Sequence, residues 1–154
     1  MELSTILKPE GVKLLGASSS KKRLFQDIGD LAEQVYGVDS QIVTECLLER
    51  EVLGPTGVGN GIALPHARLE SVKEVCGLFV RLEKPLEFDA VDRQPVDLIF
   101  ALFAPINAGV DHLKALALVS RTLRNPNTCT KLRANDAPTI LHTILTEAQT
   151  SQAA

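Results

Sequence analysis

The residues best suited to chemistry in this 154-residue chain lie in one stretch, residues 57–68. Glycine occupies three alternating positions at its start, so the loop can adopt positive φ angles and let another molecule approach its backbone. Pro65 fixes its own φ angle and removes one donor, which stiffens the chain just before His66. Because free imidazole titrates near neutral pH, His66 can offer a neutral, nucleophilic ring nitrogen. The sequence therefore predicts a pre-set loop that presents one histidine for chemistry.

Two common glycine-rich motifs do not fit this stretch. The spacing of Gly57, Gly59 and Gly61 differs from that of a dinucleotide-binding fingerprint, and no acidic residue completes a ribose site. No Lys-Ser or Lys-Thr pair follows the glycines, which excludes a P-loop. An ordinary connection that contains a structural histidine is the plain alternative.

A longer pattern links this stretch to a known family. Glu49-Arg50-Glu51 together with residues 56–66 resembles the phosphorylation-site motif of the enzyme IIA proteins of the bacterial phosphotransferase system (PTS), in the mannitol/fructose-type branch. Residues 88–92 and 94–98, and His112-Leu113 with Leu116, also match. The resemblance extends from residue 3 to about residue 147 and is closest to the nitrogen-regulatory IIA proteins.

The resemblance implies roles for three side chains. His66 is the implied phosphoryl acceptor, which becomes a phosphohistidine and then passes the group on or stores it. Arg50 is implied to lie beside it, because a guanidinium offers a planar fork suited to phosphate. His112 is implied to donate a hydrogen bond to the phosphoryl group and to stabilise its charge. From spacing alone, Arg50 would be a solvated helix residue paired with a glutamate, and His112 an exposed residue of a first helical turn.

The glycine-rich loop and a helix terminus can add to such a site. Closely spaced backbone amides form an anion nest, and simple turn geometry is the alternative explanation of the glycines. A helix N-terminus at His112 would favour added negative charge, and we expect Asp111 to cap that helix rather than point inward. The amides predicted to hold phosphoryl oxygens belong to Gly57, Gly59, Asn60 and Gly61.

No metal or cofactor is predicted. Two histidines without a placed third ligand make a poor zinc site. His142 has no counterpart in the resemblance, and we interpret it as a surface residue of the last helix. We interpret the three aspartates that flank the strand starting near residue 96 as turn and strand-edge residues; these are Asp89, Asp92 and Asp97.

Length and composition predict one domain, residues 1–154, with a core at about 3–147 and a flexible tail at 148–154. A net charge of -3 argues against a general nucleic-acid partner. The basic run Lys21-Lys22-Arg23 is expected at the solvated start of a helix. Three separated cysteines without a CxxC pair support neither a zinc knuckle nor a disulfide framework.

The chain shows neither a signal-peptide h-region nor an apolar run long enough to span a membrane. We therefore expect a cytoplasmic protein with no membrane insertion.

Hydrophobic patterning predicts a three-layer α/β/α sandwich, an α/β (α+β) fold whose mixed central sheet has helices on both faces. A serine N-cap at 18–20 opens a helix that Gly37 ends, and Asp39 or Ser40 caps the next. Further helices are expected at about 111–124, from Asn127 or Thr128 to Arg133, and after a cap at Asp136. The predicted strands are 12–15, 75–82 and 96–104, the last apolar enough to be covered on both faces.

Two functions fit the resemblance. The first is a signalling phosphocarrier that takes phosphate from a histidine-phosphorylated, HPr-like carrier of the nitrogen branch and acts on regulatory targets such as potassium-transport proteins or sensor kinases. The second is a sugar-transport IIA that passes phosphate to a IIB domain for mannitol or fructose uptake. A binding module that no longer accepts phosphate is a third possibility. Whether such a carrier counts as an enzyme stays open.

Partner choice should depend on the surface around His66. We expect an apolar docking patch formed by Ile62, Leu64 and Leu69. Ala67-Arg68 stands where many relatives have Gly and Lys, which changes the geometry of the charge beside the histidine.

Overall fold

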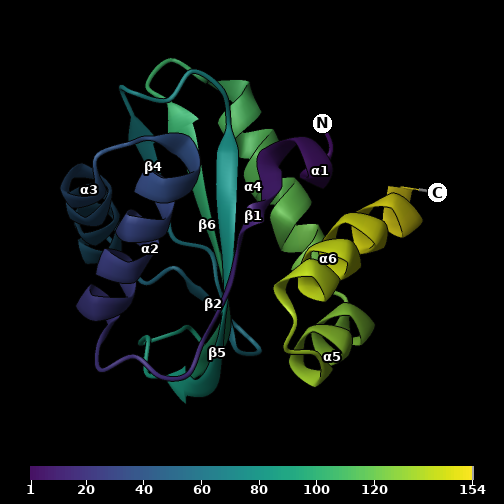
Figure 1. The fold of residues 1–154 in the computed structure, drawn as a ribbon. Helices are drawn as coiled ribbons and strands as arrows, with labels where there is room; N and C mark the ends of the chain where they lie inside the picture. The colour runs from purple at the N-terminus through teal and green to yellow at the C-terminus, as the bar shows by residue number, and fades with distance from the viewer. Residues whose placement is uncertain (154) are drawn as a thin grey trace.

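The apolar middle of the chain forms a six-stranded mixed sheet in the computed structural model (Figure 1). Its main path runs β1-β5-β6-β3-β2, and β4 pairs with β6 beyond β3. β6 is parallel to β3 and β4 but antiparallel to β5, and β5 is parallel to β1. The strands are β1 (Leu7–Leu15), β2 (Gly57–Gly59), β3 (Ile62–Ala63), β4 (His66–Leu69), β5 (Cys76–Leu86) and β6 (Val96–Pro105).

Helices cover both faces of this sheet, as the sequence predicted. Figure 1 shows α2 and α3 on one face and α1, α4, α5 and α6 on the other. The structure describes the backbone of residues 1–153 and the side chains of residues 1–148. The helices are α1 (Leu3–Ile6), α2 (Lys21–Tyr36), α3 (Ser40–Val52), α4 (Val110–Leu123), α5 (Pro126–Ala134) and α6 (Pro138–Ala153).

Two hydrophobic cores follow from this layering. Strand side chains alternate between faces, so neighbouring residues of the central strand β6 enter different cores. Ile99, Ala101 and Phe103 pack toward α2 and α3. Leu98, Phe100 and Leu102 pack toward α4, α5 and α6. The fully apolar pattern of residues 96–104 is therefore explained by burial on both faces.

The predicted helix boundaries hold where capping chemistry is explicit. Ser20 accepts a hydrogen bond from the Arg23 amide, Asp39 accepts one from the Ile42 amide, and Gly37 ends α2 at a φ of 71°. The prediction for Asp111 was wrong, since the N-cap of α4 is Gly109 and no side chain caps it. α6 runs through Ala153 where we expected a flexible tail from residue 148; residue 154 and the side chains after 148 lie outside the described residues.

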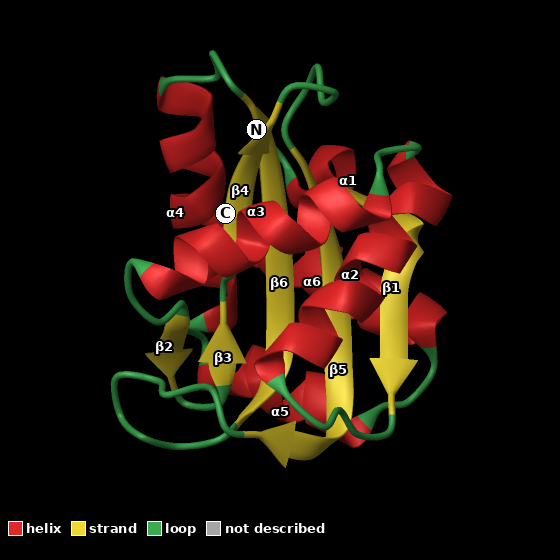
Figure 2. Cartoon of the chain, turned by 90° about the vertical axis from the view of Figure 1, so that its left-hand side faces the viewer, coloured by secondary structure: helices red, strands yellow, loops and turns green. Residues whose placement is uncertain are grey.

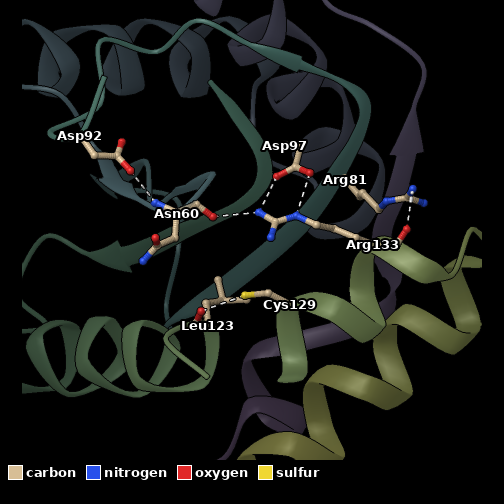
Figure 3. Close-up of polar contacts among 7 residues, drawn as sticks. All are labelled: Asn60, Arg81, Asp92, Asp97, Leu123, Cys129 and Arg133. Carbon is tan, nitrogen blue, oxygen red and sulfur yellow. Dashed lines mark hydrogen bonds and ion pairs between the residues drawn. The ribbon is translucent and has the colours of Figure 1, made fainter. Parts of the chain in front are cut away.

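Residues 57–63, predicted as a loop, form the β2–β3 hairpin. Asn60 and Gly61 make its tip with φ angles of 58° and 79°, the left-handed pair that a two-residue turn requires. The Asn60 amide donates to Asp92 Oδ2 at 2.9 Å, and Arg133 Nη2 donates to the Asn60 carbonyl at 2.8 Å (Figure 3). Arg133 also forms an ion pair with Asp97 at 2.9 Å.

These contacts give Asp92 and Asp97, two of the aspartates near β6, structural roles. Asp92 also accepts from the Gln94 amide at 3.1 Å, and Asp97 receives two bonds from Arg133. On the outer side of the hairpin, the Val91 amide donates to the Gly57 carbonyl at 3.2 Å, so the segment after Asp89 covers the β2 edge.

The hairpin tip predicts a large difference between two glycine-to-alanine substitutions. A Cβ at Gly61 would overlap the Arg133 guanidinium and lie 2.8 Å from Asp97 Oδ1, whereas a Cβ at Gly37 meets nothing within 4 Å. Gly37→Ala should cost only backbone strain, about 1 to 2 kcal/mol. Gly61→Ala should cost about 2 kcal/mol more because it also displaces an ion pair. Denaturant unfolding of both variants measures this, and equal losses would contradict the packing described.

Candidate functional site

His66 lies at an edge of the sheet where the two helical layers meet. β4 pairs with β6, placing His66 opposite Leu102, and the strand path gives β4 no second neighbour among the described residues. Figure 2 shows β4 beside α4 at this edge, with α3 passing across it. The end of α3 therefore carries Arg50 to the histidine from one layer, and the first turn of α4 carries His112 from the other.

The hydrogen bonds of His66 define its tautomer. Nδ1 lies 2.9 Å from the Leu64 carbonyl oxygen. Because a carbonyl only accepts, Nδ1 must carry the ring proton. Nε2 is then unprotonated, and it accepts a hydrogen bond from Arg50 Nε at 3.3 Å. The lone pair available for chemistry is therefore that of Nε2.

Arg50 is itself held in place by the turn that follows α3. Its Nη1 donates to the Gly54 carbonyl at 3.0 Å while its Nε contacts His66. From spacing alone, Arg50 would have been a solvated residue paired with a glutamate. The structure instead places its guanidinium beside the imidazole.

His112 is the second imidazole of the site. Its ring centroid lies 5.5 Å from that of His66 at an interplanar angle of 71°. The residue is 6% exposed, so it is not the exposed helix-start residue that spacing alone suggests. Its Nε2 is buried without a hydrogen-bond partner among the described residues. Such a group costs free energy unless it is paired, so this nitrogen is available for a hydrogen bond within the site.

Both histidines favour the neutral form. Burial lowers the pKa of His66 below its ordinary value and the Arg50 charge lowers it further, while the Leu64 carbonyl and Glu51 partly oppose this. Burial also lowers the pKa of His112, with added contributions from His66 and Arg68. A neutral imidazole keeps its nucleophilic lone pair, so the environment suits His66 as a nucleophile.

A surface cleft of about 480 Å³ brings the three predicted side chains together. Sequence reasoning did not assign several other residues of its lining, because a helical residue gives no signal of which cleft it faces. The lining consists of Cys46, Glu49, Arg50, Leu53, His66, Ala67, Arg68, His112, Leu113 and Leu116. Arg68 also donates to the Ile106 carbonyl at 3.0 Å, which ties β4 to the loop before α4.

The predicted phosphate loop is not part of this cleft. The Asp97 amide bonds to the Gly61 carbonyl at the start of β6, whereas His66 pairs with Leu102. Five residues of strand separate these positions, about 16 Å along the sheet. Gly57, Gly59, Asn60 and Gly61 thus form a hairpin directed away from His66, and turn geometry explains the glycines.

Two further expectations were wrong, and a third held only in part, because burial was not visible in the sequence. Ile62, Leu64 and Leu69 are buried and cannot form a docking patch. His142 is partly buried, with its Nε2 2.9 Å from the Leu7 carbonyl. The basic run starts α2 with Lys22 and Arg23 exposed, as expected, but Lys21 is half-buried and its ammonium donates to Glu51 and to the Phe88 carbonyl.

Comparison with known proteins adds the family. Residues 5–147 match the family described as phosphoenolpyruvate-dependent sugar phosphotransferase system, EIIA 2. The chain belongs to the EIIA 2 family. It is 44% identical over 149 residues to a nitrogen regulatory protein of Klebsiella oxytoca, covering 96% of this chain and 92% of that protein.

This EIIA 2 domain is also similar to a second nitrogen regulatory protein and to a fructose-specific component. The crystal structure of the nitrogen regulatory protein IIA-Ntr from Neisseria meningitidis superposes with a TM-score of 0.86 at 38% identity, covering 93% of this chain and 98% of that one. A PTS fructose-specific EIIA component of Haloferax volcanii is 33% identical, with 95% and 96% coverage. The family assignment and the mixed, two-faced sheet predicted from the sequence are thus confirmed.

Two features are absent from the part of the EIIA 2 domain that the structure describes. Across the described residues, no helix is both long and apolar enough to cross a membrane. Within the same part of the chain, no group of three or more His, Cys, Asp or Glu side chains is placed to hold a metal ion.

The two arginines predict separate shifts of the two histidine titrations. Arg50→Gln should raise the pKa of His66, because it removes a positive charge that lowers it. Arg68→Gln should raise that of His112 for the same reason. NMR titration of the imidazole resonances measures both. Because the charge on His66 also lowers the pKa of His112, the larger shift in each variant should fall on the histidine named, and the reverse order would disprove the assignment of charges.

The same lowered pKa values predict how stability depends on pH. Below the unfolded pKa, about 6.5, the unfolded chain binds more protons than the folded one. The contribution of the neutral imidazoles should therefore be complete above that pH and be lost as the pH falls through the folded pKa values. The free energy of unfolding, measured across this pH range, should depend less on pH in the double variant His66→Gln, His112→Gln than in the wild type.

Proposed function

We propose that this chain is a phosphocarrier that accepts a phosphoryl group on Nε2 of His66 from a histidine-phosphorylated, HPr-like protein. The observation that supports this most directly is the fixed tautomer of His66. Its proton is held at Nδ1 by Leu64, and an unprotonated Nε2 lies in an open cleft beside a guanidinium and a second imidazole.

Transfer would need no acid or base. Arg50 Nε, which donates to Nε2 before transfer, first turns to the phosphoryl oxygens and releases the lone pair. The lone pair of Nε2 then attacks phosphorus in line, the N–P bond of the donor phosphohistidine breaks, and its electron pair returns to the donor imidazole. The Nδ1 proton stays in place, and the Leu64 carbonyl stabilises the positive charge that the ring gains. Arg50 and His112 Nε2 then donate to the phosphoryl oxygens. We therefore assign His66 as acceptor and Arg50 and His112 as stabilising groups.

The surface beside the cleft suits a protein donor. Leu53 is 83% exposed and Leu113 is 66% exposed, and both line the cleft. Leu53 follows α3 and Leu113 lies in α4, so they flank His66 from both helical layers. We propose that these two side chains, in place of the buried Ile62, Leu64 and Leu69, form the docking patch for the carrier.

The output is proposed to be regulatory. Similarity to nitrogen regulatory proteins over nearly the whole chain supports signalling in the nitrogen branch, with potassium-transport proteins or sensor kinases as the classes of target. Transfer to a IIB domain for fructose or mannitol uptake is the second candidate, and similarity to a fructose-specific component favours it. We place either role in the cytoplasm.

The direct test is phosphotransfer from labelled phosphoenolpyruvate through enzyme I and the HPr-like carrier. The wild type should acquire acid-labile label, His66→Ala should acquire none, and His112→Ala should be slowed by about 100-fold, as expected when a stabilising donor is lost. A wild type that stays unlabelled with a competent carrier from the same cell would refute the proposal. Onward transfer to an added IIB domain would favour the sugar-transport role.

The docking patch makes a separate prediction. Leu113→Asp should slow transfer from the carrier by about tenfold or more, because it places a charge in an apolar contact. Ile140→Asp is the matched control, since Ile140 is also an exposed apolar helix residue but does not line the cleft. Stopped-flow transfer rates and melting temperatures of both variants decide the point, and equal rates would remove Leu113 from the docking surface.

A further inference from the structure

Glu51 is a buried acidic residue next to the site that the proposed transfer does not use. Its side chain is 7% exposed. Burying a carboxylate is expensive unless it is paired and hydrogen-bonded. The arrangement of its partners therefore shows what this charge does.

Glu51 ties three separate segments together. Its Oε2 accepts from the Thr56 amide at 2.9 Å and from Lys21 Nζ at 3.0 Å, and its Oε1 accepts from the Thr56 hydroxyl at 2.5 Å. Lys21, at the start of α2, also donates to the Phe88 carbonyl at 2.8 Å, and its ammonium lies 4.7 Å from the centroid of the Phe88 ring. Both oxygens of the carboxylate are thus occupied, and Thr56 is held through backbone and side chain.

Two chains of contacts connect this carboxylate to the His66 imidazole. Between Glu51 and Thr56 lies the turn whose Gly54 carbonyl accepts from Arg50 Nη1. On the other side, the Thr56 carbonyl accepts from the Leu64 amide at 2.9 Å. The Leu64 carbonyl in turn holds His66 Nδ1. One carboxylate therefore fixes the turn that holds the guanidinium and the residue that supports the imidazole.

We propose that Glu51, neutralised by Lys21, is a positioning residue that fixes the positions of Arg50 and His66 relative to each other through Thr56. This inference rests on the proposed phosphoryl transfer for its functional consequence, although its structural part can be measured without any transfer. Lys21 has a second effect in this arrangement. It compensates a negative charge that would otherwise oppose a phosphoryl group on the neighbouring histidine.

The structural part is tested by NMR of side-chain protons in the unphosphorylated protein. In the wild type, the His66 Nδ1–H and Arg50 Nε–H protons should be protected from solvent exchange. Glu51→Gln keeps the shape but weakens the Thr56 and Lys21 contacts, so both protons should exchange at least about tenfold faster. Thr56→Val changes no charge and should also make both protons exchange faster. It replaces Glu51→Gln in this test if Glu51→Gln does not fold.

Two comparisons separate positioning from general stability and from charge. Asp97→Asn breaks an ion pair of similar length at the far end of the sheet and should leave both protons protected. Glu51→Gln removes a charge that raises the pKa of His66 and Thr56→Val keeps it, so of the two variants Glu51→Gln should have the lower His66 pKa. Arg50, Arg68 and His112 themselves are not substituted in any of the three variants.

The functional part uses transfer from the phosphorylated HPr-like carrier. Glu51→Gln and Thr56→Val should both transfer about 10- to 100-fold more slowly than Asp97→Asn, as expected for a misplaced nucleophile. Unchanged proton protection in Glu51→Gln, or equal slowing by Asp97→Asn, would overturn the positioning role. A wild type with protected protons but no phosphate uptake would uphold the positioning and refute the proposed function instead.

Discussion

The hydrogen bond between His66 Nδ1 and the Leu64 carbonyl determines which chemistry the site can perform. It fixes the ring proton on one nitrogen and leaves the other nitrogen unprotonated, where its lone pair accepts a hydrogen bond from Arg50 Nε. The bond spans only two residues, and Pro65 between them stiffens the backbone that makes it. The local sequence Leu-Pro-His therefore sets the tautomer, and the remaining parts of the site act on an imidazole that is already oriented.

The position of β4 supplies the second requirement, access. A histidine in the middle of this sheet would be enclosed by strands and by two hydrophobic cores. Among the residues that the structure describes, β4 has a neighbouring strand on one side only, so the ring can contact both helical layers and still face a cleft. The edge at β2 is treated differently. There the Val91 amide and the Asp92 carboxylate occupy backbone groups of Gly57 and Asn60, which protects the edge from pairing with another chain.

Much of this arrangement could be predicted from the sequence, and the exceptions share a physical cause. The caps at Ser20, Gly37 and Asp39 follow from local chemistry, and the apolar run of β6 follows from burial on both faces. The direction in which a loop or a side chain points could not be derived from the local sequence. The glycines at 57–61 suit an anion nest and a tight hairpin equally well, and only the distant Arg133 and Asp97 show which one is present. Likewise, neither Glu51 nor Leu64 carries a signal in the sequence for its burial.

The residues of the site come from α3, β4 and α4, which lie far apart in the chain and belong to opposite sides of the sheet. Arg50 reaches His66 only if α3 has packed on one core, and His112 reaches it only if α4 has packed on the other. A chain with either layer detached would keep its histidine but lose the environment that makes the imidazole neutral and accessible. The proposed phosphorylation site would thus be complete only in a fully folded chain, and damaged or newly made chains would not accept phosphate until both halves of the molecule are assembled.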